Sequence, residues 1–126
     1  PNVSFRMADI TKKWDWASEK YDLVTCNLIL EHIDNLDFIF QKAFSNLGNG
    51  GYFFVSELHP FKQYKGTKAR FESPEGKVEL ETYTHHISEF TSAARDAGFE
   101  LEKLNEWFDE DQLEIPRLIS FLFYKK

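Results

Sequence analysis

The chain has 126 residues, of which 42% are hydrophobic and 17% aromatic, and its formal net charge is −6. This length and composition suit one folded domain and exclude a disordered chain. The acidic balance argues against a nucleic-acid partner, because phosphate backbones attract clusters of Lys and Arg. No stretch reaches the ~18 consecutive apolar residues of a membrane span, and we see no secretory signal. We therefore expect a cytoplasmic protein with no membrane partner.

The first half of the chain predicts two strands and a helix. Residues 3–10 alternate apolar and polar side chains, which is typical of a strand. Residues 21–30 form an apolar run interrupted by a single amide, Asn27, and predict a buried strand. Apolar residues then recur at helical spacing over 36–47, with Asp34 or Asn35 as the N-cap and the glycines from Gly48 to Gly51 as the stop.

The second half predicts three strands, a possible hairpin and a second helix. Residues 52–58 read as a strand that Pro60 ends, and a hairpin can form around Ser73–Gly76. Ser88 is the expected N-cap of the second helix, and Gly98 ends it. Two strands follow, separated by an acidic turn: one alternating strand with a wet face and a core Trp107, then the C-terminal strand.

This order of elements predicts an α/β fold. Strand–helix–strand alternation favours a parallel sheet with right-handed crossovers. The last two strands are joined by a short turn and should pair antiparallel. No internal repeat or domain linker interrupts the chain, so we expect a single domain over residues 1–126.

Polar residues gather where three successive strands end. In open α/β sheets, ligands bind beyond the carboxyl ends of the strands. The first candidate strand ends at Asp9 and Ile10, the second at Asn27 to His32, and the third at Glu57 to His59. These residues are therefore the candidates for a binding site.

Four segments in order resemble the class I S-adenosylmethionine-dependent methyltransferases: "FRMADI", "YDLVTCNLILEHI", "LGNGGYFFVSE" and "SEFTSAARDAGFELEKL". The resemblance extends from Phe5 to Tyr124. It implies a partial doubly wound, Rossmann-like sheet, mostly parallel with an antiparallel C-terminal strand. It also implies S-adenosyl-L-methionine as the cofactor and methyl transfer to a small-molecule acceptor as the reaction.

The resemblance assigns roles position by position. Asp9 would lie by the adenine amino group, with the Ile10 backbone beside it. The backbone of Asn27 would lie against the methionine portion of the cofactor, and Leu28 would pack on the adenine ring. His32 and His59 would lie on the acceptor side and are the candidate catalytic residues.

The insertion at about residues 59–86 is expected to act as a lid over the acceptor. It combines Lys62, Lys65, Lys68 and Arg70 with aromatic residues, although a solvated surface loop would have the same composition. Tyr64 and Arg70 would meet an anionic or planar substrate. Glu57 and His86 are the other candidate substrate-binding residues.

The sequence departs from the family at its cofactor loop. The family binds its cofactor chiefly through a glycine-rich loop after its first strand and an acidic residue ending its second. Here the single G-x-G, at Gly48–Gly50, follows a helix, which is the wrong context for such a loop. We therefore expect an N-terminally truncated methyltransferase domain that is inactive alone. Its bare strand edge at residues 22–28 is expected to pair with a second copy.

Two other functions remain open. The chain could be a non-catalytic binding module with a methyltransferase-like fold, or a metallohydrolase using Glu31, His32, Glu57 and His59. Methyl transfer needs no metal, because the sulfonium is already activated and the enzyme supplies positioning and sometimes a base. Cys26, the only cysteine, lies in an apolar run and is expected to be a buried core thiol.

Overall fold

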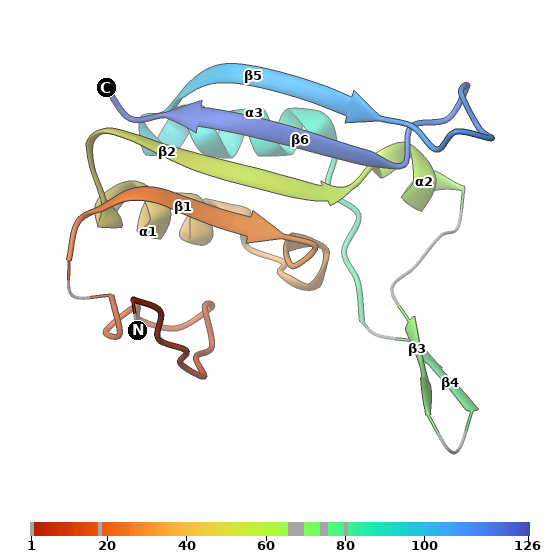
Figure 1. Cartoon of the computed structure of the whole chain (residues 1–126), viewed down its shortest axis with the longest axis horizontal. Coiled ribbons are helices and arrows are strands. Elements are labelled where there is room, and N and C mark those ends of the chain that lie inside the picture. Colours follow the sequence, from red (N-terminus) through yellow and green to blue (C-terminus); the bar gives the residue numbers. More distant parts are fainter. Residues whose placement is uncertain (1, 18, 66–69, 74–75, 80) are drawn as a thin grey trace.

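One mixed sheet of four strands organises the molecule (Figure 1). The computed structural model describes residues 2–17, 19–65, 70–73, 76–79 and 81–126; in 70–73 and 76–79 it describes the backbone alone. The sheet order is β1-β2-β6-β5. Its strands are β1 (Tyr21–Asn27), β2 (Leu47–Leu58), β6 (Leu118–Tyr124) and β5 (Glu100–Trp107).

The pairing directions confirm the predicted mixed sheet. β1 and β2 are parallel, whereas β6 runs antiparallel to both of its neighbours, β2 and β5. The C-terminal strand therefore inserts between β2 and β5, and β1 stands at one edge. The carboxyl ends of β1 and β2 meet at the same end of the sheet.

Two helices, α1 (Leu36–Asn46) and α3 (Ile87–Ala97), cover one face of the sheet (Figure 1). Their apolar stripes bury an aromatic core in which Phe40 meets Phe53 and Phe123 edge-on, at centroid distances of 5.2 and 5.5 Å. All three phenylalanines are fully buried. This packing fixes the helices on the sheet and leaves the strand ends free to build a site.

Short elements surround the carboxyl end of the sheet. A single 3-10 turn, η1 (Leu30–His32), follows β1, and the short helix α2 (Pro60–Tyr64) follows β2. The predicted hairpin is present, as β3 (Arg70–Ser73) paired antiparallel with β4 (Gly76–Glu79). In Figure 1 it extends away from the sheet.

The strand predicted over residues 3–10 is wrong. Residues 2–9 have no regular structure, and Val3, Phe5 and Met7 are 60%, 93% and 103% exposed. Alternation favours a strand only where a neighbouring strand accepts its hydrogen bonds. No strand in the described part of the chain pairs with this segment.

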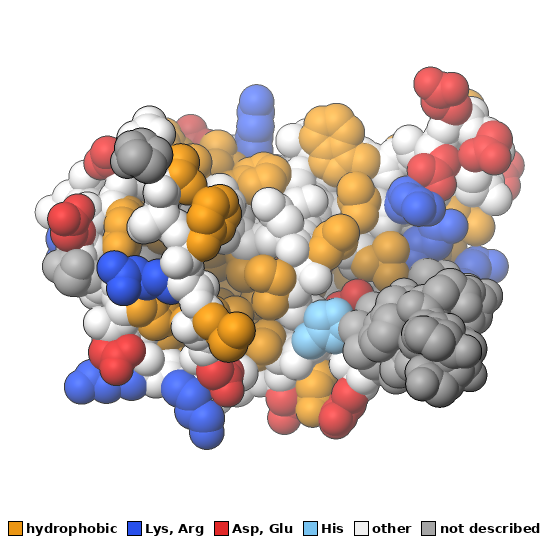
Figure 2. Space-filling view, turned by 60° about the horizontal axis from the view of Figure 1, so that its bottom comes forward, with side chains coloured by type: hydrophobic (Ala, Val, Ile, Leu, Met, Phe, Trp, Pro, Cys, Tyr) orange, Lys and Arg blue, Asp and Glu red, His pale blue; other side chains and the backbone are white. Residues whose placement is uncertain are grey.

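The predicted buried strand is shorter than its apolar run. β1 ends at Asn27, and the chain turns at Leu28 before it enters η1. Leu28 and Ile29 are 54% and 40% exposed. Val3, Phe5, Met7 and Leu23 are exposed as well. Figure 2 shows hydrophobic side chains spread over one face of the molecule.

Two helix ends differ from the prediction. Of the two residues predicted to cap the start of α1, Asn35 does so: its Oδ1 accepts from the Phe38 N–H at 3.2 Å. The predicted glycine stop is wrong, because α1 ends at Asn46 and β2 begins at Leu47. The predicted N-cap of α3 is also wrong: His86 takes that place, and the Glu89 carboxylate accepts from its N–H at 3.2 Å.

Strand β5 is more exposed than predicted. Its alternation predicts one solvent-exposed face, yet all eight of its residues are exposed on this edge strand. Trp107, predicted to be core, is 53% exposed, and its Nε1–H donates to Ser120 Oγ at 2.9 Å. Gly98 does end α3, in the left-handed conformation at φ 113°.

Helices long and apolar enough to cross a bilayer are absent from the described ranges. Cys26 is buried as predicted. Burial and the neighbouring Glu57 raise the pKa of its thiol to about 12. The thiol is therefore not a nucleophile near neutral pH.

Candidate functional site

The turn after β1 places Leu28 at the carboxyl end of the sheet. Its N–H still donates to the Ser56 carbonyl at 2.8 Å, which extends the ladder with β2 by one residue. Its φ is 55°, the left-handed conformation. This conformation costs a residue with a Cβ about 1–2 kcal/mol, so neighbouring contacts must hold the turn. Strain of this kind gathers at ligand sites.

The buried carboxylate of Glu57 holds the turn. Its Oε2 accepts from the Ile29 N–H at 3.2 Å, and its Oε1 accepts from the Leu30 N–H at 3.1 Å. Glu57 is 2% exposed. Burial raises its pKa to about 7 and outweighs the opposing effect of the backbone N–H donors. Glu57 was predicted to contact substrate; in the structure both of its carboxylate oxygens accept from the backbone.

A cavity of about 320 Å³ opens where η1 leads into α1. Its lining joins the N-terminal segment, η1, the start of α1 and the segment after β4: Thr11, His32, Ile33, Asp34, Asn35, Phe38 and Tyr83. The cavity has an aromatic and aliphatic wall and several polar groups. This mixture is typical of a small-molecule site.

Thr11 connects this cavity to the predicted cofactor residue Asp9. Asp9 Oδ1 accepts from the Thr11 hydroxyl at 2.6 Å and from its N–H at 2.9 Å. These two bonds hold the pKa of the Asp9 carboxyl below its usual value. Asp9 is therefore an oriented carboxylate at the cavity margin, although it lies in a loop and not at a strand end.

His32 lies in the same cavity with one ring nitrogen engaged. Its Nδ1 lies 3.0 Å from the Glu81 carbonyl oxygen, which can only accept, so Nδ1 carries the proton. In the neutral ring Nε2 then holds a lone pair; it lies 3.9 Å from Glu31 Oε1. The side chain is 30% exposed, so Nε2 can meet a ligand. This geometry suits a general base.

His59 is arranged differently from His32. Its Nδ1 accepts from the Phe61 N–H at 3.0 Å as the N-cap of α2, and its Nε2–H donates to Glu106 Oε2 at 2.7 Å. The residue is 4% exposed. Both ring nitrogens are thus used to hold α2 and β5 at the end of β2.

The sequence matches the family model described as "Methyltransferase domain" over residues 1–104. The chain belongs to this methyltransferase-domain family. No curated protein matches the sequence.

Solved methyltransferases share the fold of this domain. The S-adenosylmethionine-dependent methyltransferase of Mesorhizobium loti is 16% identical with a TM-score of 0.75, over 98% of this chain and 71% of that one. An S-adenosylmethionine-dependent methyltransferase of Clostridium acetobutylicum is 14% identical with a TM-score of 0.72, over 95% of this chain and 63% of that one. The CcbJ methyltransferase of Streptomyces caelestis is 15% identical with a TM-score of 0.67, over 95% and 66%. The chain thus spans less than two thirds of the length of two of these proteins.

The predicted lid of the methyltransferase domain is tied down near both of its ends. The Tyr64 hydroxyl hydrogen-bonds His86 Nδ1, which joins α2 to the start of α3. Gln63 Nε2 donates to Glu31 Oε2 at 3.1 Å, and the Tyr83 N–H donates to the Glu31 carbonyl at 2.6 Å. Tyr64 and His86 therefore lie together, whereas the Arg70 side chain lies outside the described residues.

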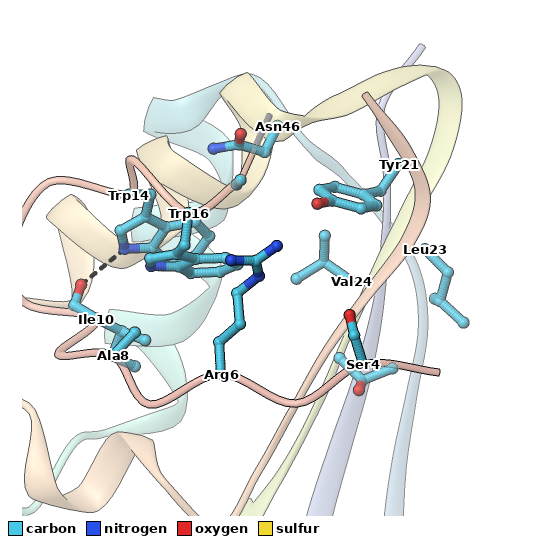
Figure 3. A pocket seen from close by; sticks show the side chains of 12 residues that line it. Ser4, Arg6, Ala8, Ile10, Trp14, Trp16, Tyr21, Leu23, Val24 and Asn46 are labelled. Carbon is cyan, nitrogen blue, oxygen red and sulfur yellow. Dashed lines mark hydrogen bonds between the residues drawn. The ribbon is translucent and has the colours of Figure 1, made fainter. Parts of the chain in front are cut away.

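A second, larger cavity of about 500 Å³ lies on the outer side of β1 (Figure 3). The indoles of Trp14 and Trp16 stack there at 5.1 Å, and the Arg6 side chain reaches toward them. The Trp14 Nε1–H donates to the Ile10 carbonyl at 2.8 Å, so the backbone oxygen of Ile10 is engaged here. The cavity flanks the edge of the sheet and not the strand ends, so we do not place the methyltransferase site in it.

Several residues of the site were not predicted from the sequence. Thr11, Tyr83 and Gln63 lie in loops or in a five-residue helix, and no periodicity marks them. Glu106 sits on the alternating strand β5, and only the sheet order brings it to His59. The Asp9-x-Thr11 spacing is the one available signal, because Asp commonly accepts from the backbone two residues on.

The described residues offer no ligand set for the metallohydrolase alternative. Within the described ranges, no group of three or more His, Cys, Asp or Glu residues could hold a metal ion. The side chains of Glu57 and His59 already form hydrogen bonds, Glu57 with the backbone and His59 with Glu106. Glu31 and His32 alone give too few ligands for a catalytic zinc site.

Proposed function

We propose that this chain forms part of an enzyme that transfers a methyl group from S-adenosyl-L-methionine to a small-molecule acceptor. The observation that carries the proposal is that Thr11, which binds the Asp9 carboxylate, and His32 line the same cavity. Membership of the methyltransferase-domain family supports the reaction class. The solved relatives named above support the cofactor.

The described residues fit part of such a cofactor. The exposed Leu28 side chain offers an apolar surface for a planar ring, and the oriented Asp9 carboxylate can accept from an amino group. Asp9, Asn27 and Leu28 would hold it, and Ile10, whose carbonyl already accepts from Trp14, would lie next to Asp9. The cofactor supplies a methyl group on a positively charged sulfur, so the protein has only to bind, orient and exclude water.

His32 is our candidate for the proton acceptor. Nδ1–H is held by the Glu81 carbonyl, so Nε2 can receive a proton from an acceptor hydroxyl or amine in the cavity. Tyr83 donates its hydroxyl to Glu81 Oε1 at 2.9 Å and also lines the cavity. His59 is less suited, because a base there would have to break the cap of α2.

We further propose that the chain alone binds the cofactor weakly and does not turn over. It has no glycine-rich loop in the strand-to-helix context that the family uses. A cytoplasmic location remains part of this proposal.

Isothermal titration with S-adenosylmethionine tests the proposal on this chain and on any longer natural gene product. Binding by the longer product alone is expected. Micromolar binding by this chain would contradict its predicted weakness. Binding by neither would favour the alternative, a non-catalytic module with a methyltransferase fold.

A further inference from the structure

We propose that Glu57 is a positioning residue for the cofactor, which it serves by folding residues 27–30 into the turn that presents Leu28. The proposal deepens the proposed function and rests on it for the identity of the ligand. The turn itself is a property of this chain and can be measured without any ligand.

Successive backbone N–H groups converge on Glu57. Leu28 is left-handed, and Ile29 follows at φ −120° and ψ −37°, so the N–H groups of residues 29 and 30 point to the same side. Such an arrangement is a concave binding site for an anion. Here the chain fills it with its own carboxylate, at 3.2 and 3.1 Å from the two nitrogens.

The position of Glu57 on β2 makes the contact possible. The Leu28 N–H donates to Ser56, the residue immediately before Glu57, so the end of β1 and the Glu57 side chain are held in register. Side chains alternate along a strand, and Glu57 is 2% exposed beneath the turn. Glu57 therefore acts through the backbone and does not itself touch a bound molecule.

The strained conformation of Leu28 needs contacts that stabilise it. A leucine has little reason to stay left-handed unless the residues after it are fixed, and glycine would adopt this conformation freely. The Leu28 side chain is 54% exposed, so the strain is not offset by burial of its own side chain. The two hydrogen bonds from residues 29 and 30 to Glu57 add to the Leu28–Ser56 bond in fixing the turn.

Amide hydrogen exchange on this chain, followed by NMR, tests directly whether Glu57 stabilises the turn at residues 27–30. In Glu57→Gln one of the two acceptor oxygens becomes an amide group, so exchange at Ile29 or Leu30 should accelerate at least tenfold. Amides of the core strand, such as Phe53 and Val55, should keep their rates. Glu102→Gln, the same charge change at an exposed site on β5, should alter neither set. Unchanged exchange at both Ile29 and Leu30 would overturn the proposal.

A double-mutant cycle separates holding the turn from simple packing. Glu57→Gln should lower the urea midpoint in the natural chain and lower it less in a Leu28→Gly background. Glycine adopts the left-handed conformation without strain, so the turn then depends less on Glu57. Leu28→Ala is the matched control, since alanine removes the same side chain and keeps the strain. An equal loss in the glycine and alanine backgrounds would contradict the proposal.

The ligand arm uses S-adenosylhomocysteine on the full natural gene product. Glu57→Gln should weaken its binding at least tenfold, and Glu102→Gln should leave it unchanged. Equal affinity of Glu57→Gln and wild type would overturn the positioning role. If wild type does not bind at all, the proposed function fails, and the exchange experiment alone decides whether Glu57 holds the turn.

Discussion

The imidazole of His59 donates from Nε2 to Glu106 Oε2 at 2.7 Å, while its Nδ1 accepts from the Phe61 N–H at 3.0 Å. One buried ring thus joins the end of β2 to the edge strand β5 and to the first turn of α2. A histidine committed in this way stabilises the edge of the site. Substitution of His59 should therefore affect stability more than catalysis, unlike substitution of a catalytic base.

Two substitutions of His59 distinguish these roles. Asn at this position can keep an N-cap acceptor near Nδ1, whereas Gln cannot. We expect His59→Asn to lose about 1 kcal/mol of unfolding free energy and His59→Gln about 2–3 kcal/mol, as measured by urea denaturation. His59→Asn should retain most of the activity of the full natural gene product. A loss of 10²-fold or more in kcat with both variants, the size expected for a general base, would contradict the structural role.

The raised pKa of Glu57 predicts how stability depends on pH. Its pKa rises from 4.5 to about 7 on folding, mainly through burial. Between these values the folded chain binds a proton that the unfolded chain does not. The unfolding free energy should therefore fall as pH rises through this window, by roughly 3 kcal/mol at most.

Comparison with Glu57→Gln isolates this effect from the other carboxyl groups. Urea unfolding of both proteins at intervals from about pH 4.5 to pH 7.5 gives the difference in unfolding free energy. That difference should shift toward the Gln variant as pH rises. A difference independent of pH would show that Glu57 titrates at an ordinary value.

Much of the fold could be predicted because local patterns and packing agree. The apolar periodicity of residues 36–47, the cap at Asn35 and Gly98 all act within a few residues. The prediction of a strand over residues 3–10 was wrong because no described strand pairs with this segment. The predicted end of β1 was wrong because Leu28 to Leu30 are apolar. The turn there depends on contacts distant in sequence, such as the Glu57 carboxylate, which is 27 residues from Leu30.

The site was less predictable for the same reason. Strand-end residues such as Asn27, Glu57 and His59 are found by the general rule that ligands bind beyond carboxyl ends. Which of them face a cavity depends on partners distant in sequence. Glu106 engages His59 from 47 residues away, and the Glu81 carbonyl engages His32 from 49 residues away. No residue spacing in the sequence predicts either of these two contacts.

Lys125 replaces the glycine stop that was expected for α1. Its Nζ donates to the carbonyls of Phe44 and Leu47, both at 2.7 Å, and lies 4.2 Å from the centroid of the Phe44 ring. Burial, with a contribution from Lys20, lowers its pKa. We expect Lys125→Met to lower the unfolding free energy by about 1 kcal/mol. Lys126→Met, one residue on and exposed, is the matched control; equal losses would contradict the capping role.

The free edge of β1 predicts self-association. β1 pairs only with β2 among the described strands, and Leu23 on this edge is 54% exposed. Unpaired strand edges recruit further strands, and a charged side chain blocks them. We expect light scattering to show a dimer through residues 22–28 that Leu23→Lys converts to a monomer. Leu101→Lys, on the opposite edge strand β5 at 47% exposure, should leave the dimer intact. A wild-type monomer at high concentration, or equal effects of both lysines, would contradict the predicted interface.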